Sequence, residues 1–433
     1  MIEQNDDRRI RLLIEAAAQA SASGRVLEAD QLVREAEAEA PRHPLVLNET
    51  ARRLLRRGDA AGAHTLLKRA VSQDSSHASI WLNLAAALRA LKRADEEMAA
   101  IDKVLALEPR NLRAMLQKAS LHELQGQPRA AAIIYRDVLQ TVPSGSLPPQ
   151  SLRPVFQHAF QFVAANDKEL EQFIESRLKD LRERHKDEPL QRFDRCLEIL
   201  LRKKPVYRPQ PSFMYFPRLP AIEFYDRGDF PWLDSIEAAT DDIRAELINV
   251  LKEGSSALVP YIDIPDGVSL NQWRELNQSR RWGVYYLWRA GTAIPDHIAR
   301  FPRTVAALEA WPRCDVPGYS PSAVFSILDA KTRIPAHRGV SNTRLIVHLP
   351  LIVPPGCGFR VGAERRDWQP GKAFVFDDTF EHEAWNDSDV SRAVLILDIW
   401  SPHVSAAERD MVRKVTADMG EFYGTRSYHE GGA

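Results

Sequence analysis

A repeat with a period of 34 residues occupies the first third of the chain and restricts its fold more than any other feature. Gly24, Gly58 and Gly126 lie one and two periods apart, and Lys92 fills the slot between the last two. Three further ladders keep the same spacing: Ala29, Ala63, Glu97 and Ala131; Ala36, Ala70, Val104 and Val138; Pro41, Ser75, Pro109 and Pro143. Self-similarity at this period predicts a stack of small supersecondary units.

Each unit reads as two helices with a turn after each. The glycine stands where the first helix stops, the small residue lets two helices approach closely, and the proline follows the second helix because it cannot continue one. In the third unit Trp81, Leu84, Ala85 and Leu88 form one apolar stripe at helical spacing. A single unit cannot bury such a stripe, so we expect several units to stack into a solenoid with a concave groove.

These ladders resemble the tetratricopeptide repeat (TPR) over about residues 10–143, and the sequence departs from that pattern at Lys92, Glu97 and Ser75. The resemblance implies an all-α TPR domain, which we place at residues 1–145. Because solenoids mostly serve as binding surfaces, we expect a peptide or protein partner in the groove. A structural or dimerising spacer is the alternative interpretation.

Residues 146–219 read as a helical extension followed by a proline-rich linker. Helical spacing continues through LRPVFQHAFQFVAA and through the charged amphipathic run DKELEQFIESRLKDLRERHKDE. We interpret these runs as one further helical pair or a bridging helix. Five prolines among aromatic residues between positions 203 and 220 then end the helical part, and we place the domain boundary there.

The distribution of aromatic residues separates a second architecture from the repeats. Residues 1–150 contain only Trp81 and Tyr135, whereas the other eight Trp, nine Tyr and all 16 Phe follow them. Beyond Phe224 the β-rich runs are SALVPYIDI, RWGVYYLW, SAVFSILDA, TRLIVHLPLIV, KAFVFDD and RAVLILDIW. Helical runs between them are DFPWLDSIEAATDDIRAELINVLKE and RTVAALEAW. Five or six short strands with helices outside them predict an α+β sandwich or jelly roll.

Charge and cysteine content exclude several classes of function. The chain has 58 Lys and Arg against 59 Asp and Glu, a net charge of −1, so no cationic field favours nucleic acid. Its three cysteines, Cys196, Cys314 and Cys357, are too scattered for a disulfide framework or a Cys-rich zinc site, which fits a reducing, cytoplasmic compartment. The sequence shows no signal peptide and no membrane-spanning run, so we expect a soluble protein.

The histidines are the candidates for metal chemistry. Non-haem Fe(II) oxygenases use two histidines and one carboxylate on one face of the metal, usually with the carboxylate two residues after the first histidine. The sequence contains one His-x-Asp/Glu run, His185-Lys186-Asp187, in the charged helical stretch. We interpret it as part of a surface helix.

The stretch from residue 325 to residue 402 resembles the core of the aspartyl/asparaginyl β-hydroxylase family. It carries PxHxG, RxxxHLxL and GKxxxFDDxFEHExW, with an arginine ten residues after the last histidine. The similarity extends more weakly upstream, so we place this domain at residues 220–405 and a C-terminal helix and tail at 406–433. The resemblance implies a double-stranded β-helix, of the jelly-roll or cupin type, that carries an Fe(II)- and 2-oxoglutarate-dependent oxygenase and consumes O2.

The same resemblance implies a metal site. His337 of PAHRG and His382 of FEHEAW match the two iron ligands of the family. Gly339 stands at the carboxylate position, as in the family, so two neutral imidazoles would hold the metal together with 2-oxoglutarate. We interpret Asp377 and Asp378 of FDDTF as turn residues or as groups that orient an imidazole.

Binding of the co-substrate is implied for three further residues. Arg392 matches the residue that pairs with the distal carboxylate of 2-oxoglutarate, and a planar guanidinium suits a carboxylate. Ser326 matches a hydroxyl that supports this carboxylate, and His348 matches a histidine near the metal-binding end of the co-substrate. Arg344 is a candidate for substrate binding. Two-residue alternation places it on one strand face with Ile346 and His348.

Ile346 departs from the family pattern, which has an arginine two residues before the motif histidine. If that arginine grips an acidic group of the substrate, its absence weakens the case for an aspartyl substrate. Pro350 also departs, because the family has HLG where this chain has HLP, and it removes a backbone donor from the strand. We interpret His297 and His403 as surface or capping residues. Core aromatics, one of which could line the pocket, are expected at Trp282, Trp288, Trp385 and Trp400.

Together these features predict an Fe(II)- and 2-oxoglutarate-dependent dioxygenase with TPR repeats for substrate or partner binding. The expected substrate is an aspartyl, asparaginyl or related residue in a peptide, a protein or a carrier-bound molecule. Alternatives are a hydroxylase of a free amino acid or lipid acyl chain, and a TPR scaffold with an inactive oxygenase domain. The presence of His337, His382 and Arg392 argues against inactivity.

Overall fold

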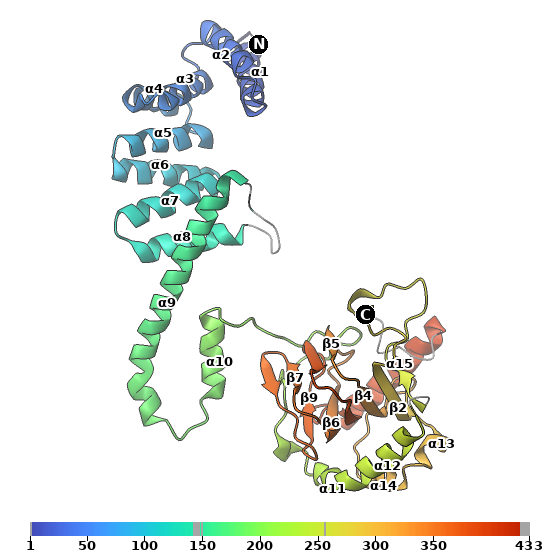
Figure 1. Cartoon of the computed structure of the whole chain (residues 1–433). Coiled ribbons are helices and arrows are strands. Elements are labelled where there is room, and N and C mark those ends of the chain that lie inside the picture. The colour runs from blue at the N-terminus through green and yellow to red at the C-terminus, as the bar shows by residue number, and fades with distance from the viewer. Residues whose placement is uncertain (1, 142–147, 149, 255–256, 425–433) are drawn as a thin grey trace. The chain divides into compact units, whose positions relative to one another are not determined.

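The chain folds into two units of different architecture (Figure 1). The computed structural model describes residues 2–141, 148, 150–254 and 257–424. Contacts between residues divide the chain into Met1–Gln191 and Arg192–Ala433. None of the described helices is long and apolar enough to cross a bilayer.

The first unit is a TPR solenoid. Its helices are α1 (Ile2–Ala22), α2 (Val26–Glu39), α3 (Pro44–Arg56), α4 (Ala60–Gln73), α5 (Ala78–Ala90), α6 (Ala94–Leu107), α7 (Leu112–Leu124), α8 (Pro128–Gln140), η1 (Gln150–Leu152) and α9 (Arg153–Arg184). Helices α2, α4, α6 and α8 begin 34 residues apart, as do α3, α5 and α7. Consecutive helices pack together along the stack, and α9 continues it as a single long helix against α8. The predicted all-α architecture is confirmed.

The glycine ladder marks the turn inside each helix pair. Gly24, Gly58 and Gly126 have φ angles of 76°, 85° and 70°, and Lys92 has a φ angle of 59° in the same slot. This left-handed conformation lets the chain leave the first helix at once, and only glycine adopts it without a steric penalty from Cβ. Lys92 therefore keeps the turn geometry at an energetic cost.

The two ladders of small residues, which start at Ala29 and Ala36, form the core between the helices, whereas Pro41, Ser75 and Pro109 of the proline ladder are exposed. The alanines and valines at these positions are buried, with exposed fractions of 8% or less. Glu97 is the exception in residue type, and it is 2% exposed. Its carboxylate accepts a hydrogen bond from Nε of Arg89 at 2.7 Å, which compensates the buried charge. Pro143 lies outside the described residues.

Replacing Lys92 with glycine is expected to stabilise the first unit, because the left-handed conformation costs a residue with a Cβ atom about 1 kcal/mol. The free energy of unfolding, measured by urea denaturation with circular dichroism, should rise by about that amount. Lys103→Gly, at an exposed position inside α6, should lower it by about 1 kcal/mol. A loss of stability in Lys92→Gly would contradict the prediction.

Two antiparallel sheets form the second unit. The larger has the order β1-β2-β4-β11-β6-β9 with β3 beside β2, and the smaller has the order β5-β10-β7-β8. The larger sheet comprises β1 (Val259–Pro260), β2 (Trp282–Arg289), β3 (Thr292–Ala293), β4 (Ala323–Leu328), β6 (Arg344–Ile352), β9 (Phe374–Phe376) and β11 (Arg392–Trp400). The smaller comprises β5 (Thr332–His337), β7 (Cys357–Val361), β8 (Glu364–Arg366) and β10 (His382–Asn386).

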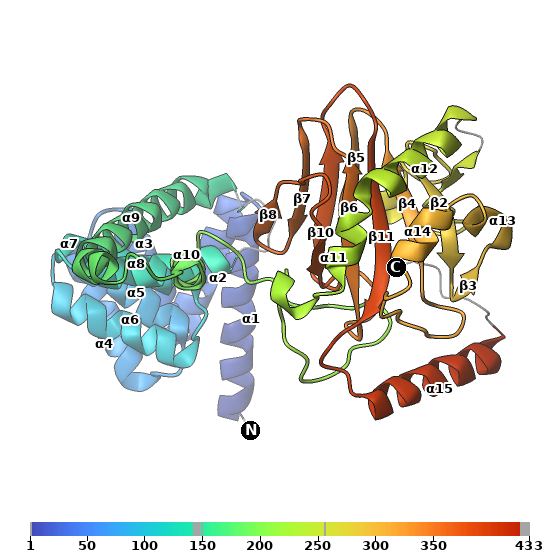
Figure 2. The same cartoon turned by 90° about the horizontal axis from the view of Figure 1, so that it is seen from below.

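The second unit also contains helices. They are α10 (Gln191–Leu200), η2 (Arg227–Asp229), α11 (Leu233–Ala238), α12 (Thr240–Lys252), η4 (Asn271–Trp273), α13 (Pro295–Ile298), α14 (Pro302–Ala307) and α15 (Ala406–Tyr423). Figure 2 shows α11 and α12 lying across the larger sheet, and α12 contacts β6. The predicted sandwich with outer helices is confirmed. The six predicted strand runs all belong to the larger sheet, and the strand pattern missed the smaller sheet entirely.

Two-residue alternation in β6 separates two cores. The residues at odd positions from 345 to 351 are buried with Leu247 of α12 in the core on the helix side. Arg344, Ile346 and His348 lie on the opposite strand face and line a pocket. A second core between the two sheets includes Ile346 together with residues of the smaller sheet. The prediction that these three side chains share a face is therefore confirmed.

The proline-rich segment lies on the second unit. Residues 192–219 fall within this unit, whereas the sequence predicts a separate extension and linker over 146–219. Backbone N–H of Gln210 donates to the carbonyl of Thr379 at 2.9 Å, and N–H of Ser212 donates to the carbonyl of Gly339 at 3.1 Å. Proline removes its own donor only, so the residues between the prolines still pair with neighbouring backbone.

Candidate functional site

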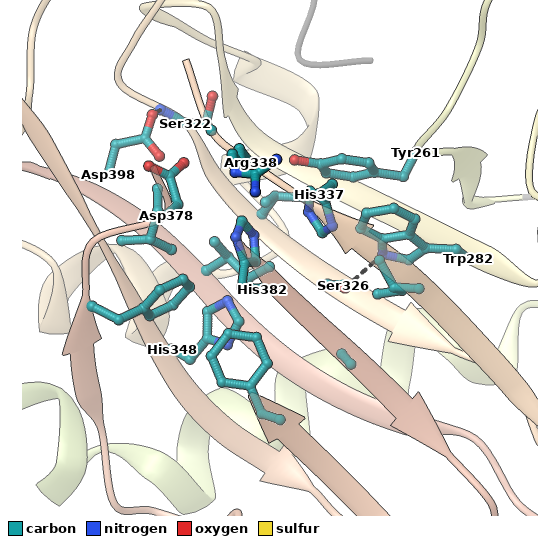
Figure 3. A pocket seen from close by; sticks show the side chains of 18 of the residues that line it. Tyr261, Trp282, Ser322, Ser326, His337, Arg338, His348, Asp378, His382 and Asp398 are labelled. Atoms are coloured by element: carbon teal, nitrogen blue, oxygen red, sulfur yellow. Dashed lines mark hydrogen bonds between the residues drawn. The ribbon is translucent and has the colours of Figure 1, made fainter. Parts of the chain in front are cut away.

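A pocket lies between the two sheets of the second unit (Figure 3). Its empty volume is about 830 Å3, including the open mouth. The walls are mostly apolar and aromatic, and the polar groups are Ser322, Ser326, His337, Arg338, Arg344, His348, Asp378, His382, Arg392 and Asp398. A few convergent polar groups in an apolar pocket are typical of a ligand site. Every residue that the sequence assigns to the site lines this pocket.

His337 and His382 face each other across paired strands. His337 ends β5, His382 begins β10, and the two residues are partners in the antiparallel register. The centroids of their rings are 4.0 Å apart. In each ring Nδ1 bonds to the carbonyl two residues earlier, at 2.8 Å to Pro335 and at 3.0 Å to Phe380. These bonds place the proton on Nδ1 and the lone pair on Nε2, the arrangement that a metal-binding imidazole needs.

Burial also keeps His382 neutral, because it lowers the pKa of this imidazole to about 4. The lone pair therefore stays available at neutral pH. Within the described ranges, no group of three or more His, Cys, Asp or Glu side chains is arranged to hold a metal ion.

The carboxylate of Asp378 fills the space of a side chain at position 339. A Cβ atom on Gly339 would lie 2.2 Å from Cγ of Asp378. The guanidinium of Arg344 pairs with Asp378 at 3.1 Å and with Asp398 at 3.2 Å, and all three side chains are buried. Arg344, the predicted candidate for substrate binding, thus lies in the pocket wall with two carboxylates beside its charge.

Arg392 is a buried cation without an acidic partner. It is 2% exposed, and its Nε has no hydrogen-bond partner. In the part of the chain that the structure describes, no carboxylate forms an ion pair with it. Its guanidinium carbon lies 4.2 Å from the ring centroid of Trp368. Burial lowers the pKa of Arg392 to about 9, which leaves it protonated near neutral pH. An uncompensated buried charge is costly, so this end of the pocket suits an anion.

His348 and Ser326 complete the polar end of the pocket. Burial, together with the nearby charge of Arg392, holds the pKa of His348 well below its ordinary value. Its Nδ1 is buried without a hydrogen-bond partner. Nε1 of Trp282 donates to Oγ of Ser326 at 3.1 Å, as Figure 3 shows, so the hydroxyl hydrogen of Ser326 is left to donate elsewhere. Both groups can therefore bind a polar ligand.

Sequence analysis missed three aromatic residues of the site. Trp368 lies against Arg392, Trp273 packs edge-on against His337 at 5.0 Å between centroids, and Tyr261 stacks on Trp282 at 4.1 Å. They have no fixed spacing from the histidine motifs, so only their aromatic character could have pointed to them. Trp282 itself is the predicted core aromatic that lines the pocket.

The remaining histidines lie outside the pocket. His185 and His403 are exposed, as predicted. His297 is half-buried rather than on the surface, because its ring stacks on Tyr285 at 4.3 Å and its Nδ1 bonds to the carbonyl of Tyr286. The backbone carbonyl and the aromatic ring satisfy it as a structural residue.

Asp377 shapes the turn before His382, and its carboxylate accepts hydrogen bonds from the backbone and hydroxyl of Thr379. Burial raises the pKa of Asp377 to about 7, and the neighbouring Asp378 adds to the effect.

The raised pKa of Asp377 makes stability depend on pH. The folded state binds this proton more tightly than the unfolded state, so stability falls as pH rises from about 4 to about 7. Asp377→Asn keeps an acceptor without the charge. The free energy of unfolding of Asp377→Asn minus that of the wild type should therefore rise by up to about 4 kcal/mol as pH increases from about 4 to about 7. Urea denaturation as a function of pH measures it, and a pH-independent difference would contradict the prediction.

Gly339→Asp places a carboxylate two residues after His337, where two-histidine, one-carboxylate iron sites usually have one. This substitution should destabilise the fold, because the new side chain would overlap Asp378. We expect a loss of about 1–3 kcal/mol in the free energy of unfolding. The double variant Gly339→Asp, Asp378→Ala should recover part of this loss, which a double-mutant cycle measures. Additive effects of the two substitutions would show that the side chains do not share this space.

Comparisons with known proteins agree with this geometry. Residues 237–402 match the family model of the aspartyl/asparaginyl beta-hydroxylases. An ornithine lipid ester-linked acyl 2-hydroxylase of Rhizobium tropici is 38% identical over 186 residues, which cover 42% of this chain and 62% of that protein. The human aspartyl/asparaginyl beta-hydroxylase is 32% identical over 181 residues, which cover 41% of this chain and 24% of that protein.

A solved structure of a thermophilic TPR protein from Thermus thermophilus aligns with a TM-score of 0.31 and 21% identity, over 40% of this chain and 96% of that one. The chain spans 62% and 24% of the lengths of the two curated relatives named above. Residues 237–402 of this chain are therefore similar to the aspartyl/asparaginyl beta-hydroxylase family, and TPR repeats precede them.

Proposed function

We propose that the chain is an Fe(II)- and 2-oxoglutarate-dependent dioxygenase that hydroxylates an unactivated C–H bond. The observation that carries the proposal is Arg392, a buried guanidinium with no acidic partner among the described residues. It lies in a pocket with two histidines whose Nδ1 atoms are tied to backbone carbonyls. A dicarboxylate bound in this pocket would supply the missing negative charge.

The residues of the pocket fit an iron ion. His337 and His382 would hold it through Nε2, and the Nδ1 bonds to the backbone would fix both ring orientations. Bound there, Fe(II) supplies the oxidative chemistry in which 2-oxoglutarate and O2 are consumed and succinate and CO2 are formed. The protein contributes positioning, neutral imidazoles and a site of low polarity.

Three residues support binding of 2-oxoglutarate. The guanidinium of Arg392 pairs with the distal carboxylate, for which its planar fork is suited. Ser326 donates its hydroxyl hydrogen to the same carboxylate, because its oxygen already accepts from Trp282. Neutral His348 offers a buried nitrogen near the other end of the co-substrate.

Aromatic side chains limit the access of water to the histidines. Trp273 packs against His337, and Tyr261 and Trp282 stack beside it. Excluding water strengthens the electrostatic contacts inside the pocket and prevents side reactions.

The expected substrate class follows from the family, with an aspartyl, asparaginyl or related residue in a peptide, protein or carrier-bound molecule as the first candidate. The first unit would bind this substrate or a partner. A groove there is lined by α5, α7, α8 and α9 and includes the side chains of Asn83, Arg113, Gln117 and Tyr135. Amide, guanidinium and aromatic groups along a solenoid groove suit an extended peptide.

Hydroxylation of a lipid acyl chain is the second candidate. One relative is named for that activity. The observation that favours it is Ile346, an apolar side chain on the pocket face of β6. An apolar wall suits an alkyl chain better than a charged side chain.

Arg392→Met tests the proposal. Loss of the anion site should raise the 2-oxoglutarate concentration for half-maximal succinate formation by about 100-fold or more. Fe(II) binding without 2-oxoglutarate, measured by calorimetry, should be unchanged. Removal of an uncompensated buried charge should also raise the melting temperature of the 2-oxoglutarate-free protein by a few degrees.

Arg360→Met is the matched control, because Arg360 pairs with Glu383 and lies outside the pocket. It should leave the 2-oxoglutarate requirement unchanged. An unaltered requirement in Arg392→Met would refute the role of Arg392. Absence of both succinate formation and Fe(II)-dependent 2-oxoglutarate binding in the wild type would refute the oxygenase itself.

A further inference from the structure

We propose that the pocket accepts a neutral or positively charged group beside the reacting C–H bond and excludes an acidic one, and that Ile346 sets this choice. The inference rests on the proposed function, since it takes the Arg392 end of the pocket as the co-substrate site. It narrows the substrate class to amides, alkyl chains and groups with a basic substituent.

Strand register separates the two ends of the pocket. On β11 Arg392 is the first residue, and Ser326 of β4 pairs with Val394 close to it. Further along β11, Ile396 pairs with His348, and Asp398 then pairs with Ile346. Six residues of extended chain separate Arg392 from Asp398, which is about 20 Å. The co-substrate anchor and the level of Ile346 therefore lie at opposite ends, with His348 between them.

At the end of the pocket near Ile346, two carboxylates surround one guanidinium. Arg344 there is flanked by the carboxylates of Asp378 and Asp398, at 3.1 and 3.2 Å. One guanidinium and two carboxylates give this group a formal charge of −1, with every member 5% exposed or less. Arg338, also in the pocket wall, pairs with Glu381 at 3.1 Å. Among the described lining residues at this end, every arginine is thus already paired with a carboxylate.

A basic side chain at the position of Ile346 would offset the second carboxylate at this end of the pocket. Ile346 is 6% exposed and lies on the pocket face between Arg344 and His348. Its strand neighbours in register are Asp398 and Phe376. A substrate carboxylate placed here would lose its hydration beside carboxylates and an apolar wall, where each lining arginine at this end already pairs with a carboxylate of the protein. An amide or methylene group meets no such penalty.

The test uses the full chain and a pair of fluorescent peptides that differ only in a central aspartate or asparagine. Binding is measured by anisotropy, so the result does not depend on turnover. The wild type should bind the asparaginyl peptide more tightly than its aspartyl twin. Ile346→Arg should strengthen aspartyl-peptide binding by about ten-fold or more and change asparaginyl-peptide binding by less than about three-fold.

Ile346→Gln is the control, because it adds polarity and length without charge and should not produce the gain. Ile346→Lys delivers the same charge on a more flexible chain and replaces the arginine variant if that variant fails to fold. The proposal is overturned if the wild type binds the aspartyl peptide as tightly as its twin, or if neither basic variant gains aspartyl binding.

Failure of the oxygenase proposal would appear separately. Fe(II)-dependent binding of 2-oxoglutarate is measured on the same protein samples, and its absence from the wild type refutes the proposed function whatever the peptides do. Its presence, together with equal peptide affinities, refutes only the charge preference assigned to Ile346.

Discussion

The antiparallel pairing of β5 with β10 is the contact on which the site depends. It sets His337 opposite His382 in register, and a slip of one residue would turn one imidazole to the other face of the sheet. Each ring is then held by the carbonyl two residues earlier in the chain, so the pair needs no other side chain to fix its tautomers. The larger sheet adds Ser326, His348 and Arg392, the proposed anion-binding residues, around this pair.

Two buried arginines on neighbouring strands illustrate how the fold divides its charges. Arg344 on β6 is flanked by two carboxylates, so its cost of burial is met within the protein. Arg392 on β11 packs on the face of Trp368 and has no carboxylate partner among the described residues. The first arginine therefore stabilises the pocket wall, and the second leaves a deficit of negative charge that a ligand can fill. Two identical side chains thus differ in charge balance according to what surrounds them, and the binding role that we propose for Arg392 follows from this difference.

Sequence analysis predicted the solenoid and the larger sheet because both have strong periodic signals, the 34-residue ladders and long buried runs such as RAVLILDIW. The smaller sheet escaped pattern reasoning, since TRIPAH and HEAWN are short and combine polar residues with a proline or a tryptophan on half-exposed strands. The family resemblance still located their histidines. The filling of the Gly339 position by Asp378, and the pairing of Arg344 with two distant carboxylates, could not be read from sequence because they arise from through-space packing.

The proline-rich segment before the sheets has a practical consequence for dividing the chain. Backbone groups of Gln210 and Ser212 satisfy the carbonyls of Thr379 and Gly339, which lie in the loops next to the strand ends that carry the two facing histidines. A fragment that begins at residue 220, where sequence similarity to the family fades, would leave these carbonyls without their partners. It would also lack Phe213 and so uncover the buried cluster, including Tyr319 and Val340, against which Phe213 packs. The folded unit thus begins earlier in the chain than the sequence similarity to the family does. A fragment meant to fold as this unit must therefore start before about residue 205.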